Sequence, residues 1–392
     1  MKTTKIQVFV FAMLFVVGAF TGCVDEDDDA ETKTTVKIGF LNPITGPLEP
    51  DAAGFSWGAK EAIKDLNAAH STYNFELVEV DSGCDGTVAG TAAQTLVDSG
   101  VVAATGAACS GASMGANVIL SAAGIPMISY ASTNPGLSDA SAYPLFYRVV
   151  PSDAIQGPAG ADMMTDAGVG NESLAILHMT NDYGSGLANS VKDAWDINGA
   201  LCGAGMQGYE EAATDFSAMV TAIADDPTCE AVYLSSYLTD GAKILEELDT
   251  QGFEGAIFGG DGAAGVGLYE VLTDNSLATN MTVSAPRAGS SYGDFEARYD
   301  ANAADVGSIK TYVLTAYDAT MIIGKAATMS GEIDANIKTT GTGYEGASGI
   351  IDFLDNGDIG GNGYDICSYG GADETYTCGK YWTAVGKVQS SA

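Results

Sequence analysis

The sequence predicts an α/β protein made of two lobes, each built on a parallel β-sheet. From residue 35 onward, short β-like runs alternate with segments of helical periodicity, which is the pattern of βαβ units. One series of such strands ends near residue 130 and a second begins near residue 173. About 370 residues would remain after an N-terminal leader, more than one ordinary core accommodates. Two α/β lobes in tandem are therefore expected.

Hydrophobic periodicity places the individual elements. Residues 36–40 alternate apolar and polar side chains, as a half-buried strand does. Residues 58–69 carry apolar side chains at i, i+3, i+4 and i+7, which predicts an amphipathic helix. Further strands are expected at 75–80, 101–105, 126–130, 173–179, 231–235, 256–259 and 281–285.

The N-terminus has the features of an export signal. Lys2 and Lys5 precede an apolar run over residues 6–20 that is too short to span a membrane comfortably. The motif FTGC resembles a lipobox, so residues 1–22 are expected to be removed and Cys23 to be lipidated, with plain secretion as the alternative. We therefore expect a lipid-anchored protein on the outer, extracytoplasmic face of the cytoplasmic membrane.

The chain is strongly acidic. Its formal net charge is −35, from 51 acidic residues against 16 Lys and Arg, and no segment concentrates basic residues. Nucleic acid is therefore excluded as a partner. So many hydrated carboxylates fit a halophilic surface, because salt screens their repulsion. The tract DEDDD directly after Cys23 is expected to form a solvated tether over residues 23–33, with a calcium site as the alternative.

Six cysteines follow Cys23. An even number in an oxidising compartment predicts three disulfides, and CxxC or CxxH spacings typical of zinc are missing. Their order suggests neighbouring pairs, although the sequence alone leaves the other connectivities open. The six residues are Cys84, Cys109, Cys202, Cys229, Cys367 and Cys378.

Candidate ligand-binding groups follow three predicted strands, where open α/β sheets bind their ligands. One strand leads into a helix at Ser110, whose N-terminal N–H groups suit a carboxylate, and Thr133 follows the next strand with a further hydroxyl. Asp261, flanked by glycines, would pair with an ammonium. A zwitterion satisfies both ends. The plainer interpretations are a helix N-cap for Ser110 and a turn residue for Asp261.

A catalytic alternative rests on Ser113. The segment GASMG matches the GxSxG nucleophile elbow of α/β-hydrolases. The triad order then requires a later histidine, but His70 precedes the serine and His178 lies inside a predicted strand. We therefore expect no enzyme, with a serine hydrolase as a remote alternative. Residues 259–267 resemble a phosphate loop only in composition, and the DNGD segment at 355–358 is expected to be a hairpin turn.

The sequence resembles the leucine/isoleucine/valine-binding proteins, the type I periplasmic solute-binding proteins of branched-chain amino-acid ABC transporters. The most specific stretch is DSGCDGTVAGTAAQTLVDSGVVAATGAACSGASMGAN, followed by GIPMISYASTNPGL and FYRVVPSDAIQGPAGA. Supporting segments are GPLEPDAAGFSWGAKEAIKDLN, NDYGSGLA, ATDFSAMV and TYVLTAYDAT. The likeness extends from about residue 36 to the C-terminus.

This resemblance implies two Rossmann-like lobes joined by a three-stranded hinge. Lobe 1 would comprise 34–152 and 283–345, and lobe 2 would comprise 153–282 and 346–392. An amino-acid-like ligand would close the hinge, and the permease of an ABC transporter would recognise the closed monomer. Neither cofactor nor metal is implied. Because the same fold serves receptors, a ligand-binding sensor for a membrane signalling partner is the alternative.

The resemblance also implies roles for single residues. Ser110, Ala131 and Thr133 fall where the family binds the α-carboxylate, the alanine through its backbone. Asp261 stands where the family places a glutamate that pairs with the α-ammonium. Cys84 and Cys109 fall at the family's N-lobe disulfide. Aromatic residues that cover the ligand or line the side-chain pocket correspond to Tyr183, Tyr237 and Tyr312.

One position departs from the family pattern. Asp51 falls where members with aliphatic ligands often carry an aromatic residue. A carboxylate there suits a polar or cationic ligand side chain better than leucine, unless the loop over 48–55 bends so that Phe55 covers the site instead. Amides, urea, polyamines and short peptides are therefore further candidate ligands.

Overall fold

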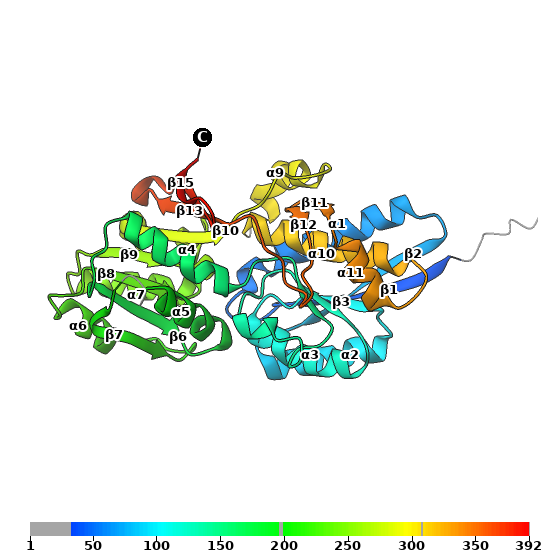
Figure 1. The fold of residues 1–392 in the computed structure, drawn as a ribbon, viewed down its shortest axis with the longest axis horizontal. Coiled ribbons are helices and arrows are strands. Elements are labelled where there is room, and N and C mark those ends of the chain that lie inside the picture. Colours follow the sequence, from blue (N-terminus) through cyan, green and yellow to red (C-terminus); the bar gives the residue numbers. More distant parts are fainter. Residues whose placement is uncertain (1–32, 196–198, 307–308, 392) are drawn as a thin grey trace, which may run out of the picture. The chain divides into compact units, whose positions relative to one another are not determined.

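The computed structural model describes residues 33–195, 199–306 and 309–391. Two large β-sheets, with helices packed against them, make up this part of the chain (Figure 1). The predicted signal segment 1–22, the lipidation site Cys23 and the acidic tract lie outside the described residues. Among the helices that are described, none is both long enough and apolar enough to cross a membrane.

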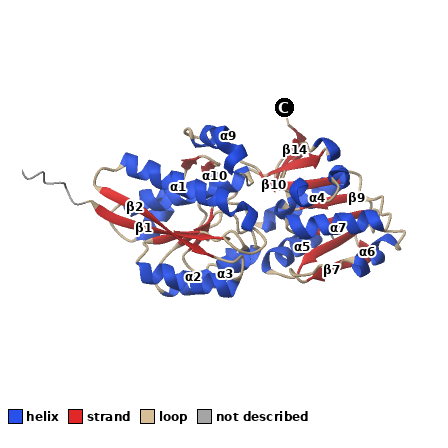
Figure 2. Cartoon of the chain, turned by 180° about the vertical axis from the view of Figure 1, so that it is seen from behind, coloured by secondary structure: helices blue, strands red, loops and turns tan. Residues whose placement is uncertain are grey.

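The first sheet has five parallel strands in the order β2-β1-β3-β4-β5. From β1 the chain runs outward to β2 and then back past β1 to β3. Because parallel crossovers are right-handed, this reversal places α1 on one face and both α2 and α3 on the other, as Figure 2 shows. The strands are β1 (Thr34–Asn42), β2 (Tyr73–Asp81), β3 (Ala103–Thr105), β4 (Met127–Ser129) and β5 (Phe146–Arg148).

Helices from distant parts of the chain complete this first layer structure. The helix α10 packs against α1 and contacts β1 and β3, so a segment beyond residue 309 returns to the N-terminal sheet. On the other face, a Cβ on Gly115 would lie 2.0 Å from the carbonyl oxygen of Gly86, so glycine lets α2 and α3 approach closely. The helices are α1 (Ala52–Ala69), α2 (Gly86–Ser99), α3 (Ser110–Ala122), α9 (Phe295–Val306), α10 (Lys310–Ala327) and α11 (Ile333–Thr340).

The second sheet has eight strands in the order β15-β14-β13-β10-β9-β8-β6-β7. The five strands from β10 to β7 in this order are parallel, whereas β13, β14 and β15 extend the sheet in antiparallel fashion. The strands are β6 (Leu174–Met179), β7 (Leu201–Tyr209), β8 (Ala231–Ser235), β9 (Ala256–Gly259), β10 (Met281–Pro286), β13 (Tyr364–Tyr369), β14 (Tyr376–Thr383) and β15 (Lys387–Ser390).

The helices of the second sheet pack in pairs. α4 contacts α5, and α6 contacts α7. From β6 the chain adds β7 at the sheet edge and then returns past β6 to β8. Because parallel crossovers are right-handed, this return places the two pairs on opposite faces. The helices are α4 (Asp153–Asp166), α5 (Asp182–Trp195), α6 (Ser217–Ala224), α7 (Leu238–Thr250) and α8 (Leu268–Val271). Short 3-10 turns are η1 (Glu49–Asp51), η2 (Pro135–Ser138), η3 (Asp261–Ala263), η4 (Asn275–Asn280) and η5 (Gly371–Asp373).

The chain passes between the two sheets after β5, after β10 and before β13. The small hairpin of β11 (Tyr344–Gly346) and β12 (Gly349–Ile351) precedes the last passage. β10 pairs with β13 over residues 282–286, so the predicted division at residue 283 falls within a strand of the second sheet. The lobe boundaries stay a prediction, while the two-lobed α/β class agrees with the observed sheets.

Three disulfides join the neighbouring pairs that the order of the cysteines suggested. Cys84–Cys109 links the chain before α2 to the chain before α3, Cys202–Cys229 links β7 to the chain before β8, and Cys367–Cys378 links β13 to β14.

A buried ion pair ties β5 to the segment that returns before β13. Arg148 is 0% exposed, and its Nε donates to Asp358 Oδ1 at 2.6 Å. Its other N–H groups donate to the Ser138 hydroxyl and to the carbonyl oxygens of Ser132 and Asn134. The hairpin turn predicted at 355–358 is present, because the Leu354 N–H donates to the Asp358 carbonyl at 2.8 Å.

Replacing Asp358 with alanine should destabilise the protein by about 3 to 5 kcal/mol, because Arg148 would remain buried without its counter-ion. Denaturant unfolding monitored by circular dichroism measures this free energy. Asp355→Ala, in the same turn but with an exposed side chain paired to Lys338, is the matched control and should leave unfolding unchanged. Equal effects of the two substitutions would contradict the role given to Arg148.

Candidate functional site

A cavity lies among loop and helix residues of the layers around both sheets, with α10 contributing Tyr312. It is bordered by the chain that follows β3, β4 and β9, which is where strand-end loops of parallel sheets meet ligands. Its lining consists of Leu48, Asp51, Phe55, Ala108, Cys109, Ser110, Ala131, Tyr183, Tyr237, Asp261, Gly262, Ile309 and Tyr312.

The start of α3 forms one end of the cavity. The helix begins at Ser110, and Cys109 occupies the cap position without a side-chain cap bond. Ser110 is therefore not the N-cap, and its hydroxyl instead accepts the N–H of Asn134 at 3.2 Å. The first N–H groups of a helix lack intrahelical acceptors and stand at the positive end of its dipole. This end of the cavity can therefore hold an anion.

The two other predicted carboxylate-binding residues differ in position. Ala131 lines the cavity, and its N–H donates to the Ser129 hydroxyl at 3.3 Å. Thr133 is fully buried and is not among the lining residues. Its carbonyl accepts the N–H of a second buried aspartate, Asp153, at 2.8 Å.

Asp261 lines the cavity from the chain that follows β9. It begins η3 directly after β9 and is 3% exposed. The Tyr183 hydroxyl donates to its Oδ1 at 3.0 Å, and the Tyr312 hydroxyl donates to its Oδ2. Burial raises the pKa of Asp261, whereas the two tyrosine hydroxyls oppose that rise by stabilising the carboxylate. The donors come from α5 and from α10, so helices of both sheets meet at this one group.

The glycine after Asp261 makes room for Tyr183. A Cβ on Gly262 would lie 2.6 Å from the Ser236 carbonyl oxygen and 2.7 Å from the Tyr183 hydroxyl. The Gly262 N–H also donates to that hydroxyl at 2.9 Å. The sequence suggested that these glycines admit a ligand; the structure adds that Gly262 admits the tyrosine that holds Asp261.

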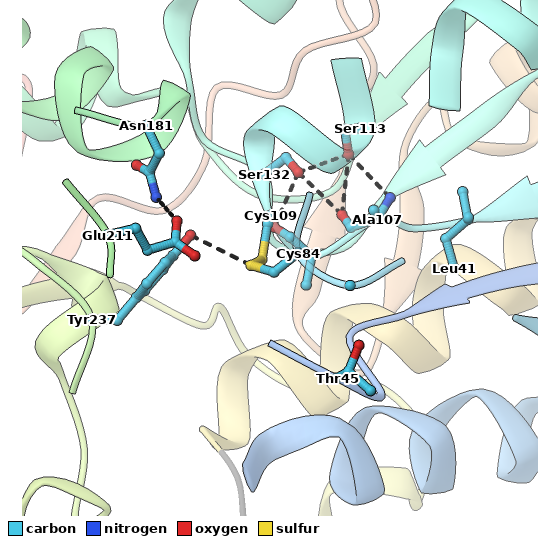
Figure 3. The surroundings of a disulfide bond; sticks show 12 residues. Leu41, Thr45, Cys84, Ala107, Cys109, Ser113, Ser132, Asn181, Glu211 and Tyr237 are labelled. Atoms are coloured by element: carbon cyan, nitrogen blue, oxygen red, sulfur yellow. Dashed lines mark hydrogen bonds between the residues drawn. A yellow bond between two sulfur atoms is a disulfide. The ribbon is translucent and has the colours of Figure 1, made fainter. Parts of the chain in front are cut away.

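Tyr183 and Tyr237 form a stacked pair on the wall of the cavity. Their ring centroids are 5.2 Å apart with an interplanar angle of 10°. Figure 3 shows the Tyr237 hydroxyl pointing to the Cys84–Cys109 disulfide, 3.8 Å from Cys84 Sγ. Asp240 fixes the backbone of Tyr237 by accepting its N–H at 3.0 Å, and burial raises the pKa of Asp240 to about 6.

A mixed set of side chains lines the rest of the cavity. Leu48, Phe55 and Ile309 are apolar, while Asp51 is 7% exposed and contributes a carboxylate. The loop thus brings both Asp51 and Phe55 to the cavity, so the two sequence-based alternatives for this position occur together. In the described part of the chain, the lining includes two carboxylates and no basic side chain.

Ser113 is not placed for nucleophilic chemistry. The residue is 0% exposed, and its hydroxyl bonds to the Ala107 backbone and to the Ser132 hydroxyl, as Figure 3 shows. His178 bonds through Nδ1 to the carbonyl of Met179, and His70 packs against aromatic rings. The GxSxG match therefore corresponds to a buried hydroxyl network that supports the loop before α3.

Comparison with known proteins decides the family. The family model described as "Receptor family ligand binding region" matches residues 58–372. The chain belongs to this family.

Individual relatives of this family member are amino-acid-binding proteins. The leucine-, isoleucine-, valine-, threonine- and alanine-binding protein of Pseudomonas aeruginosa is 27% identical over 332 residues, which cover 83% of this chain and 87% of that protein. The leucine-specific-binding protein of Salmonella typhimurium is 28% identical over 308 residues, covering 75% of this chain and 79% of that protein. The sequence resemblance to leucine/isoleucine/valine-binding proteins is thereby confirmed.

Solved structures confirm the type I periplasmic binding protein fold. The branched-chain amino acid transporter substrate-binding protein LivJ of Streptococcus pneumoniae, solved in complex with isoleucine, has a TM-score of 0.76 and 24% identity, covering 88% of this chain and 98% of that one. The leucine-binding protein LivK of Thermotoga maritima has a TM-score of 0.75 and 23% identity, covering 89% and 98%.

The structure adds lining residues that the sequence did not single out. Ile309 lies just before α10, and Leu48 lies in the loop before η1, so neither follows a strand of the sheet. The rule that ligands sit after parallel strands could not find them. Cys109 lines the cavity as well. Its position directly before the predicted helix is the feature from which the sequence could have identified it as a lining residue.

Gly262→Ala should displace the Tyr183 ring and destabilise the protein by about 1 to 3 kcal/mol, because the added methyl overpacks the wall. Thermal unfolding measures the effect. Gly360→Ala is the matched control, since a Cβ there meets nothing within 4 Å. An unchanged melting temperature for Gly262→Ala would show that the Tyr183 ring can shift without loss of stability, and would contradict this prediction.

Proposed function

We propose that the chain is an extracytoplasmic solute-binding protein that captures an α-amino acid and delivers it to the permease of an ABC transporter. One observation carries the proposal: a helix N-terminus and the carboxylate of Asp261 line the same cavity, the first from the layer of the first sheet and the second from the chain after β9. These opposite charges complement a zwitterion.

The bound amino acid is oriented by these two opposite charges. Its carboxylate accepts N–H groups at the start of α3, with Ser110 alongside, and its ammonium pairs with Asp261. Tyr183 and Tyr237 cover it with their stacked rings, and such aromatic walls bury ligand surface while their hydroxyls keep polar contacts. Thr133 supports the site from behind the wall rather than contacting the ligand. The protein catalyses no reaction in this proposal.

The side-chain end of the cavity favours an amino acid with mixed character. Leu48, Phe55 and Ile309 suit methylene groups, and the name of the Pseudomonas aeruginosa relative includes leucine, isoleucine and valine. Asp51 suits a hydrogen-bond donor or a positive charge, because its carboxylate lines this part of the cavity and offers acceptor oxygens there. We propose a ligand that is aliphatic near its Cα and polar or cationic further out.

The anchor and the partner complete the proposed function. Lipidation at Cys23 with an acidic tether over residues 23–33 would hold the monomeric body at the outer face of the cytoplasmic membrane, close to a permease. The leader and FTGC motif support this, as does the transporter named for the Streptococcus pneumoniae relative. The ligand contacts groups on both lobes, so it favours the arrangement in which both contacts are made.

Asp261→Ala should reduce amino-acid affinity by at least about 100-fold, because it removes the proposed ammonium partner from a buried site. A thermal-shift panel of L-amino acids, amides and polyamines in high salt selects ligands, since a ligand that binds the native state raises the melting temperature. Calorimetry then gives the affinity. Asp249→Ala, with an exposed side chain outside the cavity lining, is the control. Unchanged affinity in Asp261→Ala would refute the orientation.

Asp51→Tyr should shift the preference toward leucine and isoleucine by about tenfold or more relative to polar and cationic amino acids, because it replaces a carboxylate with an aromatic wall. The ratio of dissociation constants for L-leucine and L-arginine measures this shift. An unchanged ratio would place Asp51 outside the ligand's reach.

A further inference from the structure

A second aspartate is buried behind Asp261. Asp153 is the first residue of α4 and is 0% exposed. Within the described residues, neither of its carboxylate oxygens has a hydrogen-bond partner. A buried carboxylate ion without donors is strongly unfavourable, and such groups ordinarily neutralise by taking up a proton.

The charged surroundings of Asp153 sharpen this point. Asp261 and burial both raise the pKa of Asp153, while the Thr133 hydroxyl and Arg148 act in the opposite direction. Arg148 forms an ion pair with Asp358 at 2.6 Å, so the negative charge of Asp358 offsets much of the positive charge that Arg148 would exert on Asp153. Five tyrosines whose own pKa values are raised surround the two aspartates. They lie on α5, on β8, directly before α7, on α10 and on β13: Tyr183, Tyr233, Tyr237, Tyr312 and Tyr364.

Hydrogen bonding distinguishes the two acids. Asp261 receives a tyrosine hydroxyl on each carboxylate oxygen, from Tyr183 and Tyr312, which stabilises its ionised form. Among the described residues, no group meets an Asp153 oxygen in hydrogen-bond geometry, and the nearby Thr133 hydroxyl only opposes the rise in the pKa of Asp153. Two interacting carboxyl groups in a water-poor site share their protons unequally, and the one without donors keeps the proton.

We propose that Asp153 is a protonated carboxylic acid in the unliganded protein and that it releases this proton to solvent when the ligand's ammonium binds at Asp261. The second half rests on the proposed function. The ammonium brings positive charge next to the pair, which favours the ionised form of Asp153. Asp153 is thus a positioning residue. It does not line the cavity, and its protonation state determines how much negative charge lies near the bound ammonium.

Linkage fixes the direction of the pH dependence. Because binding releases a proton, raising the pH favours binding. Each released proton corresponds to an affinity gain of up to about tenfold per pH unit, over the range in which Asp153 is protonated without ligand and ionised with it. A ligand without a positive charge at this end would release no proton.

The protonation state of Asp153 can be read without any ligand. Infrared spectroscopy of the unliganded protein at pH 7.5 should show the carbonyl band of a buried carboxylic acid, and Asp153→Asn should remove it. Asp318→Asn is the matched control: Asp318 is equally buried, but Ser348 and backbone N–H groups bond to it and its pKa is raised only to about 6. The band should therefore persist in Asp318→Asn. A wild-type spectrum without the band overturns the proposal.

Proton release is counted by calorimetry with L-leucine, L-threonine and L-arginine in buffers of different ionisation enthalpy. About 0.5 to 1 proton should be released per amino acid bound near neutral pH, falling to near zero in Asp153→Asn while Asp318→Asn matches wild type. Binding with no proton released in wild type, which needs no variant to fold, overturns the coupling. Absence of binding by all three probes counts against the proposed function, whereas the infrared band still decides the state of Asp153.

Discussion

The carboxylate of Asp261, buried and held by two tyrosines, is the interaction around which the cavity is organised. A carboxylate that is 3% exposed is tolerated only where donors meet it, and these come from α5 and α10. α5 packs against the second sheet, whereas α10 packs against the first. The position of Tyr183 then requires glycine at residue 262 and sets the plane on which Tyr237 stacks. One desolvated charge therefore determines the wall, the neighbouring turn and the junction of the two lobes.

Negative charge on this protein acts differently at the surface and in the cavity. Most of the 51 acidic residues contribute to a surface where salt screens interactions beyond about 10 Å, so their combined field is weak in a saline medium. Asp261 lines the cavity and is buried, and screening reaches buried groups much less. In the proposed orientation, the attraction between Asp261 and the ligand's ammonium therefore persists at salt concentrations that weaken the field of the surface.

The sequence predicted those strands and site residues whose local pattern of apolar and polar side chains matches their surroundings in the folded protein. Except for β5 and β7, the parallel strands were predicted within a few residues because their apolar runs fit strands enclosed by helices. β7 was missed because its segment LCGAGMQGY is rich in glycine, and β13–β15 because an antiparallel extension has no βαβ signature. Strand ends led to Ser110 and Asp261. The sequence did not single out Asp153, because only tertiary packing against the chain after β4 and β9 makes it a buried acid.

Placing the two charged ends on different lobes makes the ligand itself part of the fold's closure. In the proposed orientation, the start of α3 belongs to the first sheet's layer and Asp261 to the second, so a molecule with only one of the two charges contacts one side fully. Such a molecule gains affinity without favouring one arrangement of the lobes, since a shift between states requires differential contacts. A zwitterion makes both contacts only when the two ends stand at the separation of its own charged groups. The same two contacts then give both selectivity for α-amino acids and closure of the lobes. Discrimination among different α-amino acids depends on the part of the cavity around Asp51.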